Sequence, residues 1–195
     1  MEEISVERVI IANQGENSDN YERFKEIVSK KKINVIVVGK YLKNSLDYSE
    51  LNDNNKYQRI NIENDLYFDI LWPNGSKLIQ ENILNNNSIV CKLNYKNFSI
   101  LFTGDIEEIA ERKILQEYKN ELSILNSKIL KVAHHGSRTS STKEFIEAVK
   151  PKIALIGVGE KNKFGHPNEE VINRFENLRY KNLSYRLQWR NIVNS

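Results

Sequence analysis

Short runs of β-branched and apolar residues, each followed by turn-forming residues, constrain the fold of this chain more than any other feature. Ile33–Val38 and Ile153–Val158 are almost continuous apolar runs, which is typical of strands buried on both faces. Segments with apolar residues at helical spacing alternate with such runs, as in Tyr21–Lys31 and Thr142–Lys150. This alternation of strands and helices predicts an α/β protein.

The other expected elements complete that pattern. Strands come first, in a meander, and then alternate with helices, which predicts sheet packed against sheet with helices outside, in a single domain over residues 1–195. Residues 40–57 are polar and rich in Asn, and we expect a loop there. The remaining helices are expected at Ile106–Tyr118 and Asn168–Leu178, and the remaining strands at Val6–Ala12, Tyr67–Trp72, Ser88–Tyr95, Phe98–Thr103, Lys128–Val132 and Leu183–Arg186.

Composition narrows the class of protein. The 29 Lys and Arg residues against 26 Asp and Glu give a net charge of +3, which permits a polyanionic substrate without arguing for one. The single cysteine, Cys91, excludes an internal disulfide and fits an inert core thiol. No apolar run approaches the roughly 18 residues of a membrane span, and the N-terminus does not resemble a signal peptide. We therefore expect a soluble, cytoplasmic chain.

A carboxylate follows one of the predicted buried strands, in Phe102–Thr103–Gly104–Asp105. The glycine allows close approach of the backbone, and the carboxylate of Asp105 has two oxygens that can bridge two divalent cations. A second interpretation is open, because Asp105 followed by Glu108 also matches a helix-capping box.

Two adjacent histidines follow the next strand, in Ala133–His134–His135–Gly136–Ser137. Imidazole is a common metal ligand and general acid, and neighbours in an extended segment point to opposite sides. One histidine would then ligate a metal or transfer a proton while the other supports it, unless both are ordinary surface or core residues. Downstream, Ser141 with Glu144 matches a capping box whose helix N-terminus could hold a phosphate.

The third histidine, His166, follows another buried strand in Phe164–Gly165–His166–Pro167. Packing of this imidazole against the start of the next helix is the alternative to a ligand role, and Pro167 suits the first position of that helix. All three histidines of the chain thus follow predicted strands, as Asp105 does. One aspartate with two or three histidines from separate strand ends is a common recipe for a hydrolytic Zn²⁺, Mn²⁺ or Fe site.

These motifs, in this order, resemble the second half of the metallo-β-lactamase fold, and His-His-Gly-Ser with Asn86–Asn87–Ser88 resembles its ComEC-like branch, found in DNA-uptake (competence) proteins. The resemblance implies an αββα fold. It places Asp105 as a metal-bridging aspartate, His166 as the last metal histidine, and His134 or His135 as the residue acting on metal or substrate. Ser137, Asn87 and Ser88 become substrate-binding candidates.

The resemblance also has a gap. The first metal motif of the superfamily, His-x-His/Asp-x-Asp-His, has no counterpart, because no histidine precedes His134. We therefore expect a domain incomplete in its N-terminal half. The final strand, expected near Arg186, is likewise not followed by the family's usual sequence.

The function implied by the resemblance is a metal-dependent phosphodiesterase or nuclease acting on DNA, with one or two Zn²⁺ or Mn²⁺ ions. Two alternatives stay open: a catalytically inactive chain with half a metal site, and a hydrolase of a small phosphoester or lactone. An unrelated nucleotide-binding domain is a weaker possibility, because the chain has no glycine-rich phosphate loop.

Overall fold

The computed structural model of the chain describes residues 4–13, 18–38, 57–75, 78–159, 162–179 and 186–192. The loop expected over 40–57 lies outside these residues except for Tyr57. The strand expected at Leu183–Arg186 also lies outside them except for Arg186, where the described strand begins.

The described strands form one large and one small sheet, which confirms the predicted α/β class. The large sheet has seven strands in the order β3-β4-β5-β6-β7-β8-β9, antiparallel from β3 to β6 and parallel from β6 to β9. The small sheet pairs β1 with β2 in parallel. The strands are β1 Arg8–Ala12, β2 Asn34–Val38, β3 Gln58–Glu63, β4 Leu66–Trp72, β5 Val90–Tyr95, β6 Phe98–Phe102, β7 Ile129–Lys131, β8 Ile153–Gly159 and β9 Arg186–Ile192.

The four predicted helices are confirmed to within two residues at each end, whereas the short α2 and strand β3 were not predicted. The sequence of β3, QRINIE, does not predict a strand, because it is mostly polar and only Ile60 in it is buried. The helices are α1 Asp19–Lys30, α2 Ile83–Asn86, α3 Glu108–Glu117, α4 Lys143–Val149 and α5 Glu169–Arg179, with 3₁₀ turns η2 Leu122–Leu125 and η3 Ala133–Gly136.

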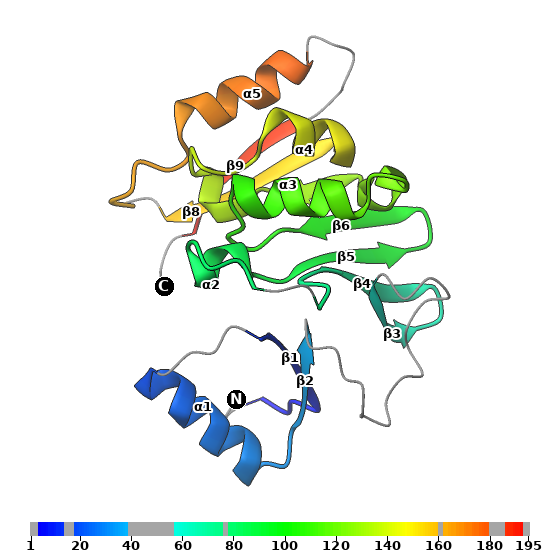
Figure 1. Cartoon of the computed structure of the whole chain (residues 1–195), viewed down its shortest axis with the longest axis vertical. Coiled ribbons are helices and arrows are strands. Elements are labelled where there is room, and N and C mark those ends of the chain that lie inside the picture. The colour runs from blue at the N-terminus through cyan, green and yellow to red at the C-terminus, as the bar shows by residue number, and fades with distance from the viewer. Residues whose placement is uncertain are drawn as a thin grey trace.

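Helices α3, α4 and α5 cover one face of the large sheet (Figure 1). The main core lies between them, where Leu101, Leu130 and Ile156 from the strands meet Ile114 and Phe175 from the helices. Burying each such side chain stabilises the fold by about 1.5–3 kcal/mol. This layer fixes the positions of β6, β7 and β8, whose carboxyl ends meet at one edge of the sheet.

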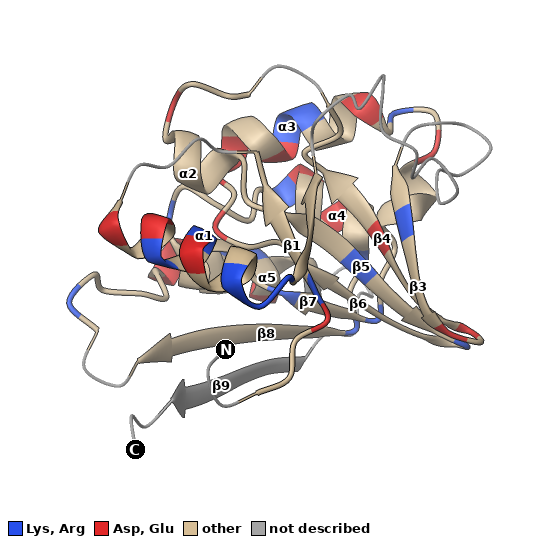
Figure 2. Ribbon diagram, turned by 90° about the horizontal axis from the view of Figure 1, so that it is seen from below, with Lys and Arg blue, Asp and Glu red and all other residues tan. Residues whose placement is uncertain are grey.

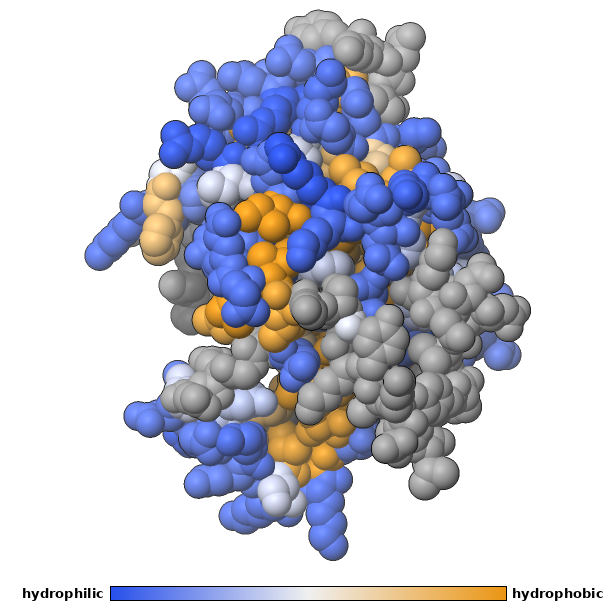
Figure 3. Space-filling view, in the orientation of Figure 1, coloured by the Kyte–Doolittle hydropathy of each residue, from blue (hydrophilic) through white to orange (hydrophobic). Residues whose placement is uncertain are grey.

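The other face of the large sheet packs against the β1–α1–β2 unit. Val38 with Ile10 and Ile36 of this unit joins Ile60 and Ile70 of the large sheet in a second, smaller core. Apolar side chains gather where the two parts meet (Figure 3), whereas charged residues spread along the outer helix α1 (Figure 2). The expected packing of sheet against sheet with helices outside is therefore observed.

Helix starts differ from those expected at the level of single residues. Ser18 caps α1 by accepting a hydrogen bond from the Tyr21 amide, and Asp19, which suits a cap by residue type, is instead the first residue of the helix. Thr142, not Ser141, caps α4 by accepting from the Phe145 amide. Helix α5 begins at Glu169, so Pro167 precedes it. Within the described residues no helix is long and apolar enough to cross a membrane.

Candidate functional site

Three loops meet at the carboxyl ends of β6, β7 and β8 and carry all the histidines of the chain. Because these strands are parallel neighbours, the residues that follow them lie along one edge of the sheet. We call Asp105, His134, His135 and His166 the histidine edge. The sequence predicted each of these residues as a site residue, and the structure brings them together.

Backbone contacts lock the three loops to one another. The His134 amide donates to the Gly104 carbonyl at 3.0 Å, and the Asn168 amide donates to the Gly136 carbonyl at 2.8 Å. Gly136 has φ +79°, and a Cβ there would lie 2.6 Å from Cβ of Pro167. Only glycine fits such a position, so the glycine after the two histidines is explained by close approach of two loops.

His134 and His135 occupy the left-handed region of the backbone, with φ 47° and 54°. The expectation of an extended segment is therefore wrong, because the chain makes a tight turn here. The two side chains nevertheless contact different partners: that of His134 lies against His166, and that of His135 lies against Gly157 and Asp105. Left-handed non-glycine residues cost about 1–3 kcal/mol each and cluster at functional sites, where the surrounding structure holds them.

His134 and His166 face one another, with ring centroids 5.7 Å apart and planes at 65°. The Nδ1 atoms of both rings are buried and have no hydrogen-bond partner. His134 Nδ1 lies 3.5 Å from Glu107 Oε1, which is ion-pair distance without hydrogen-bond geometry. Burial lowers the pKa of His166, and His134 and His135 lower it further, which favours the neutral imidazole. Native proteins rarely leave such atoms unpaired without a functional reason.

His135 is held in one tautomer. Its Nδ1 lies 2.6 Å from the Gly157 carbonyl, and because a carbonyl oxygen can only accept, Nδ1 carries the proton. The neutral ring then has its lone pair on Nε2, which lies 3.8 Å from Oδ1 of Asp105. Both side chains are about half exposed, so Nε2 of His135 can exchange a proton with a molecule at the surface.

Asp105 does not cap a helix. Helix α3 begins at Glu108, after an N-cap at Glu107 that makes no side-chain capping bond, so the capping interpretation of Asp105 is wrong. Gly104 before it has φ +53°, and a Cβ there would lie 2.6 Å from Cβ of Ser88. Ser88 therefore packs closely against the turn at Gly104 that precedes Asp105.

Asn87 is buried completely, and its amide is used within the protein. It accepts from the Ile79 amide at 3.0 Å and donates to the carbonyls of Ile79 and Ile83. With no accessible atom, Asn87 cannot contact a substrate directly, and its predicted role is corrected to a structural one. Ser137 is also nearly buried, with its hydroxyl 3.0 Å from that of Thr139.

Helix α4 does not offer its N-terminus to a phosphate. The carboxylate of Glu111 accepts from the amides of Ser141 at 2.6 Å and Thr142 at 2.7 Å. The positive end of this helix is thus occupied by an anion of the protein itself. Sequence reasoning missed Glu111, since its position within an ordinary helical pattern gives no sign of this bond.

Lys131 is a second residue that sequence reasoning missed. It ends β7, directly before the histidine loop, and its side chain lies against Gly157, where a Cβ would be 3.4 Å from Cε. Burial lowers the pKa of Lys131, whereas the nearby charge of Asp105 opposes this effect. Its position at the end of a predicted strand, shortly before the two histidines, was the available signal.

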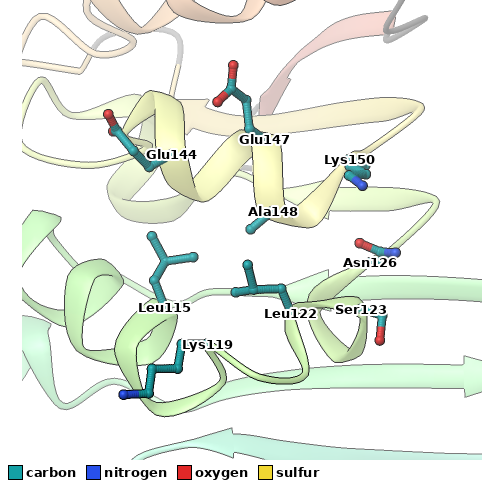
Figure 4. Close-up of a pocket in the computed structure, with 9 residues that line it drawn as sticks. All are labelled: Leu115, Lys119, Leu122, Ser123, Asn126, Glu144, Glu147, Ala148 and Lys150. Carbon is teal, nitrogen blue, oxygen red and sulfur yellow. The ribbon is translucent and has the colours of Figure 1, made fainter.

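A groove of about 410 Å³ lies elsewhere, between η2 and α4 (Figure 4). Leu115, Leu122 and Ala148 form its apolar part, and charged side chains including Lys119 and Glu144 form its rim. It contains no residue of the histidine edge.

The donor set of the histidine edge is incomplete for a metal ion. In the part of the chain that the structure describes, no group of three or more His, Cys, Asp and Glu side chains is arranged to hold a metal. Protein metal centres usually need three or four such ligands. The two unpaired imidazole nitrogens supply part of a set, so the described residues alone do not make a complete metal centre.

Comparison with known proteins gives several relatives, competence proteins among them. No protein-family model matches the chain. It is 33% identical over 108 residues to ComE operon protein 3 of Bacillus subtilis, 35% over 107 residues to competence protein ComA of Neisseria gonorrhoeae, and 33% over 116 residues to recombination protein 2 of Haemophilus influenzae. The chain has relatives among competence proteins. These matches cover 55–60% of the chain and only 13–15% of the length of the relatives.

Proposed function

We propose that this chain is the hydrolase-like part of a DNA-uptake protein of the ComEC kind, and that its histidine edge acts on a phosphodiester. One observation carries the proposal: two buried imidazole nitrogens, on His134 and His166, have no partner at an edge where three parallel strands end. The competence proteins among its relatives support the choice of DNA as substrate. Membership of the metallo-β-lactamase superfamily is part of the same proposal and rests on the motifs.

The residues of the histidine edge would have different roles, according to how exposed each side chain is. Nε2 of His135, fixed as the free nitrogen by the bond to Gly157, takes or gives the proton at the reacting oxygen. The ammonium of Lys131, near Asp105, attracts the anionic phosphate. His134, His166 and Asp105 are not arranged as a three-ligand metal site in the structure. With a closer Asp105 they would hold a Zn²⁺ or Mn²⁺ ion, which would supply Lewis-acid activation of water. Further ligands are needed to complete that centre.

Hydrolysis of bis(p-nitrophenyl) phosphate tests this proposal, with Mn²⁺ and Zn²⁺ each supplied and removed. We expect metal-dependent release of nitrophenolate that Asp105→Ala abolishes and Glu108→Ala leaves unchanged, because Glu108 is exposed and pairs only with Arg112. Equal rates for the chain and Asp105→Ala would refute the proposal. Parallel assays with p-nitrophenyl phosphate and a simple lactone separate a phosphodiesterase from a hydrolase of small esters.

A second candidate is a catalytically silent binding module. The incomplete donor set among the described residues favours it, because two or three ligands hold a divalent ion weakly. In that case the assay above gives no turnover with any metal, while the chain still binds oligonucleotides.

A further inference from the structure

Phe164 is the most exposed large apolar side chain among the described residues, at 81%. Its ring stacks on the imidazole of His166, with centroids 6.0 Å apart and planes at 19°. An aromatic ring that stacks on one side and is largely exposed leaves its other face open. The open face is on the other side of the Phe164 ring from His166, next to the histidine edge.

The loop that carries Phe164 is closed by one side chain. The Asn162 amide donates to the His166 carbonyl at 2.9 Å, and its oxygen accepts from the His166 amide at 3.0 Å. Gly165 between them has φ +68°, a conformation that favours glycine. The loop thus fixes Phe164 beside His166 instead of burying it, although burial would stabilise the fold.

We propose that Phe164 is a stacking platform for one nucleobase of the substrate. This inference rests on the proposed phosphodiesterase function and adds the part of the substrate that the site holds. A base on the open face would continue the stack of Phe164 and His166, and would place the adjoining phosphodiester at the histidine edge. Lys163, exposed beside Phe164, suits the phosphate backbone. A base must leave its duplex partner to stack in this way, so single strands are favoured over duplex.

Binding without catalysis tests the platform. The probe is a fluorescein-labelled oligothymidylate, compared with an abasic oligomer of the same length and charge, and read by anisotropy at fixed salt without divalent metal. We expect Phe164→Ala to weaken oligothymidylate binding about 5- to 150-fold, the range for loss of one base stack. Abasic binding should be unchanged, and Phe164→Tyr should restore the affinity.

Phe98→Ala is the matched control, because Phe98 is also exposed, at 41%, but begins β6 at the end away from the site. It should leave both affinities unchanged. An equal loss for both oligomers in Phe164→Ala, no loss in either, or no binding of oligothymidylate by the chain would each overturn the inference. The hydrolysis assay is independent, because bis(p-nitrophenyl) phosphate has no base: turnover there with no Phe164 effect here rejects the platform alone.

Discussion

Two polar clusters lie side by side in this protein, and they differ in how well their hydrogen-bonding groups are satisfied. In the α3 carboxylate cluster, Glu107 and Glu111, every carboxylate oxygen accepts at least one hydrogen bond: from the side chains of Thr139, Asn82 and Asn86 in Glu107, and from the Ser141 and Thr142 amides in Glu111. In the histidine edge, two buried ring nitrogens accept and donate nothing.

This difference in hydrogen bonding indicates that the α3 carboxylate cluster supports the fold and that the histidine edge meets a ligand. A polar group that only supports the fold is paired by the fold itself, because an unpaired buried group costs about 1–3 kcal/mol. A group that meets a ligand is left unpaired in its absence. We therefore expect mutation to affect mainly stability in the α3 carboxylate cluster and mainly function in the histidine edge.

The largest expected effect is on catalysis, from His135→Gln. Glutamine has no nitrogen that can both take and give the proton, so hydrolysis should fall about 10²- to 10⁴-fold, the usual contribution of a general acid or base. Initial rates with bis(p-nitrophenyl) phosphate measure this. A rate within a factor of two of the unmodified chain would remove His135 from the proposed chemistry.

The next effect is on stability, from Glu111→Ala. The change leaves the buried amide of Ser141 and the partly buried amide of Thr142 without these acceptors. The free energy of unfolding should therefore fall by about 2–5 kcal/mol. Urea denaturation measures it. Glu108→Ala, in the same helix but exposed and paired with Arg112, should change stability by less than about 0.5 kcal/mol. Equal losses would contradict the structural role of Glu111.

Cys91 is a partly buried polar group outside both clusters that no ligand is expected to reach. Burial raises the pKa of its thiol from 9.0 to about 11. The thiolate is the reactive form, so at pH 8 its population is about 100-fold below that of an ordinary cysteine. Labelling with a thiol-specific disulfide reagent should be slowed by about this factor and recover in urea. Fast labelling of the folded chain would show that the second core is open.

The smallest effect is expected from His134→Gly, which should not show the loss of stability expected for Glu111→Ala. Glycine accepts the left-handed backbone at φ 47°, and the change removes an unpaired buried nitrogen. These gains offset the lost packing against His166, so stability should stay within about 1 kcal/mol of the unmodified chain or rise. A loss comparable to that of Glu111→Ala in urea denaturation would erase the distinction between the clusters.

Sequence patterns were informative where many residues repeat one signal. Apolar runs such as Ile153–Val158 predicted the strands, and strand order with parallel pairing then brought His134, His135, His166 and Asp105 to one edge. The short strand β3 escaped prediction because a half-exposed strand at the sheet edge leaves few apolar positions to count.

Roles that depend on three-dimensional partners could not be predicted. Asn87 and Ser88 are adjacent, yet one is completely buried in backbone bonds and the other braces the Gly104 turn. Asp105 matched a capping box, but α3 begins beyond it. Glu111 caps a helix 30 residues away in sequence, which no local pattern encodes. Such contacts depend on tertiary distances, whereas propensity and periodicity report only local preference.

The most direct test of the central claim is the imidazole ¹⁵N spectrum of the chain during titration with Zn²⁺, a diamagnetic ion. The chain has only three histidines, so each ring is assigned by single substitution. We expect Nδ1 of His134 and of His166 to shift together with the added ion, while Nδ1 of His135 keeps its proton and its hydrogen bond to the Gly157 carbonyl. Unchanged shifts at His134 and His166 would contradict it, because their unpaired nitrogens would then serve no metal.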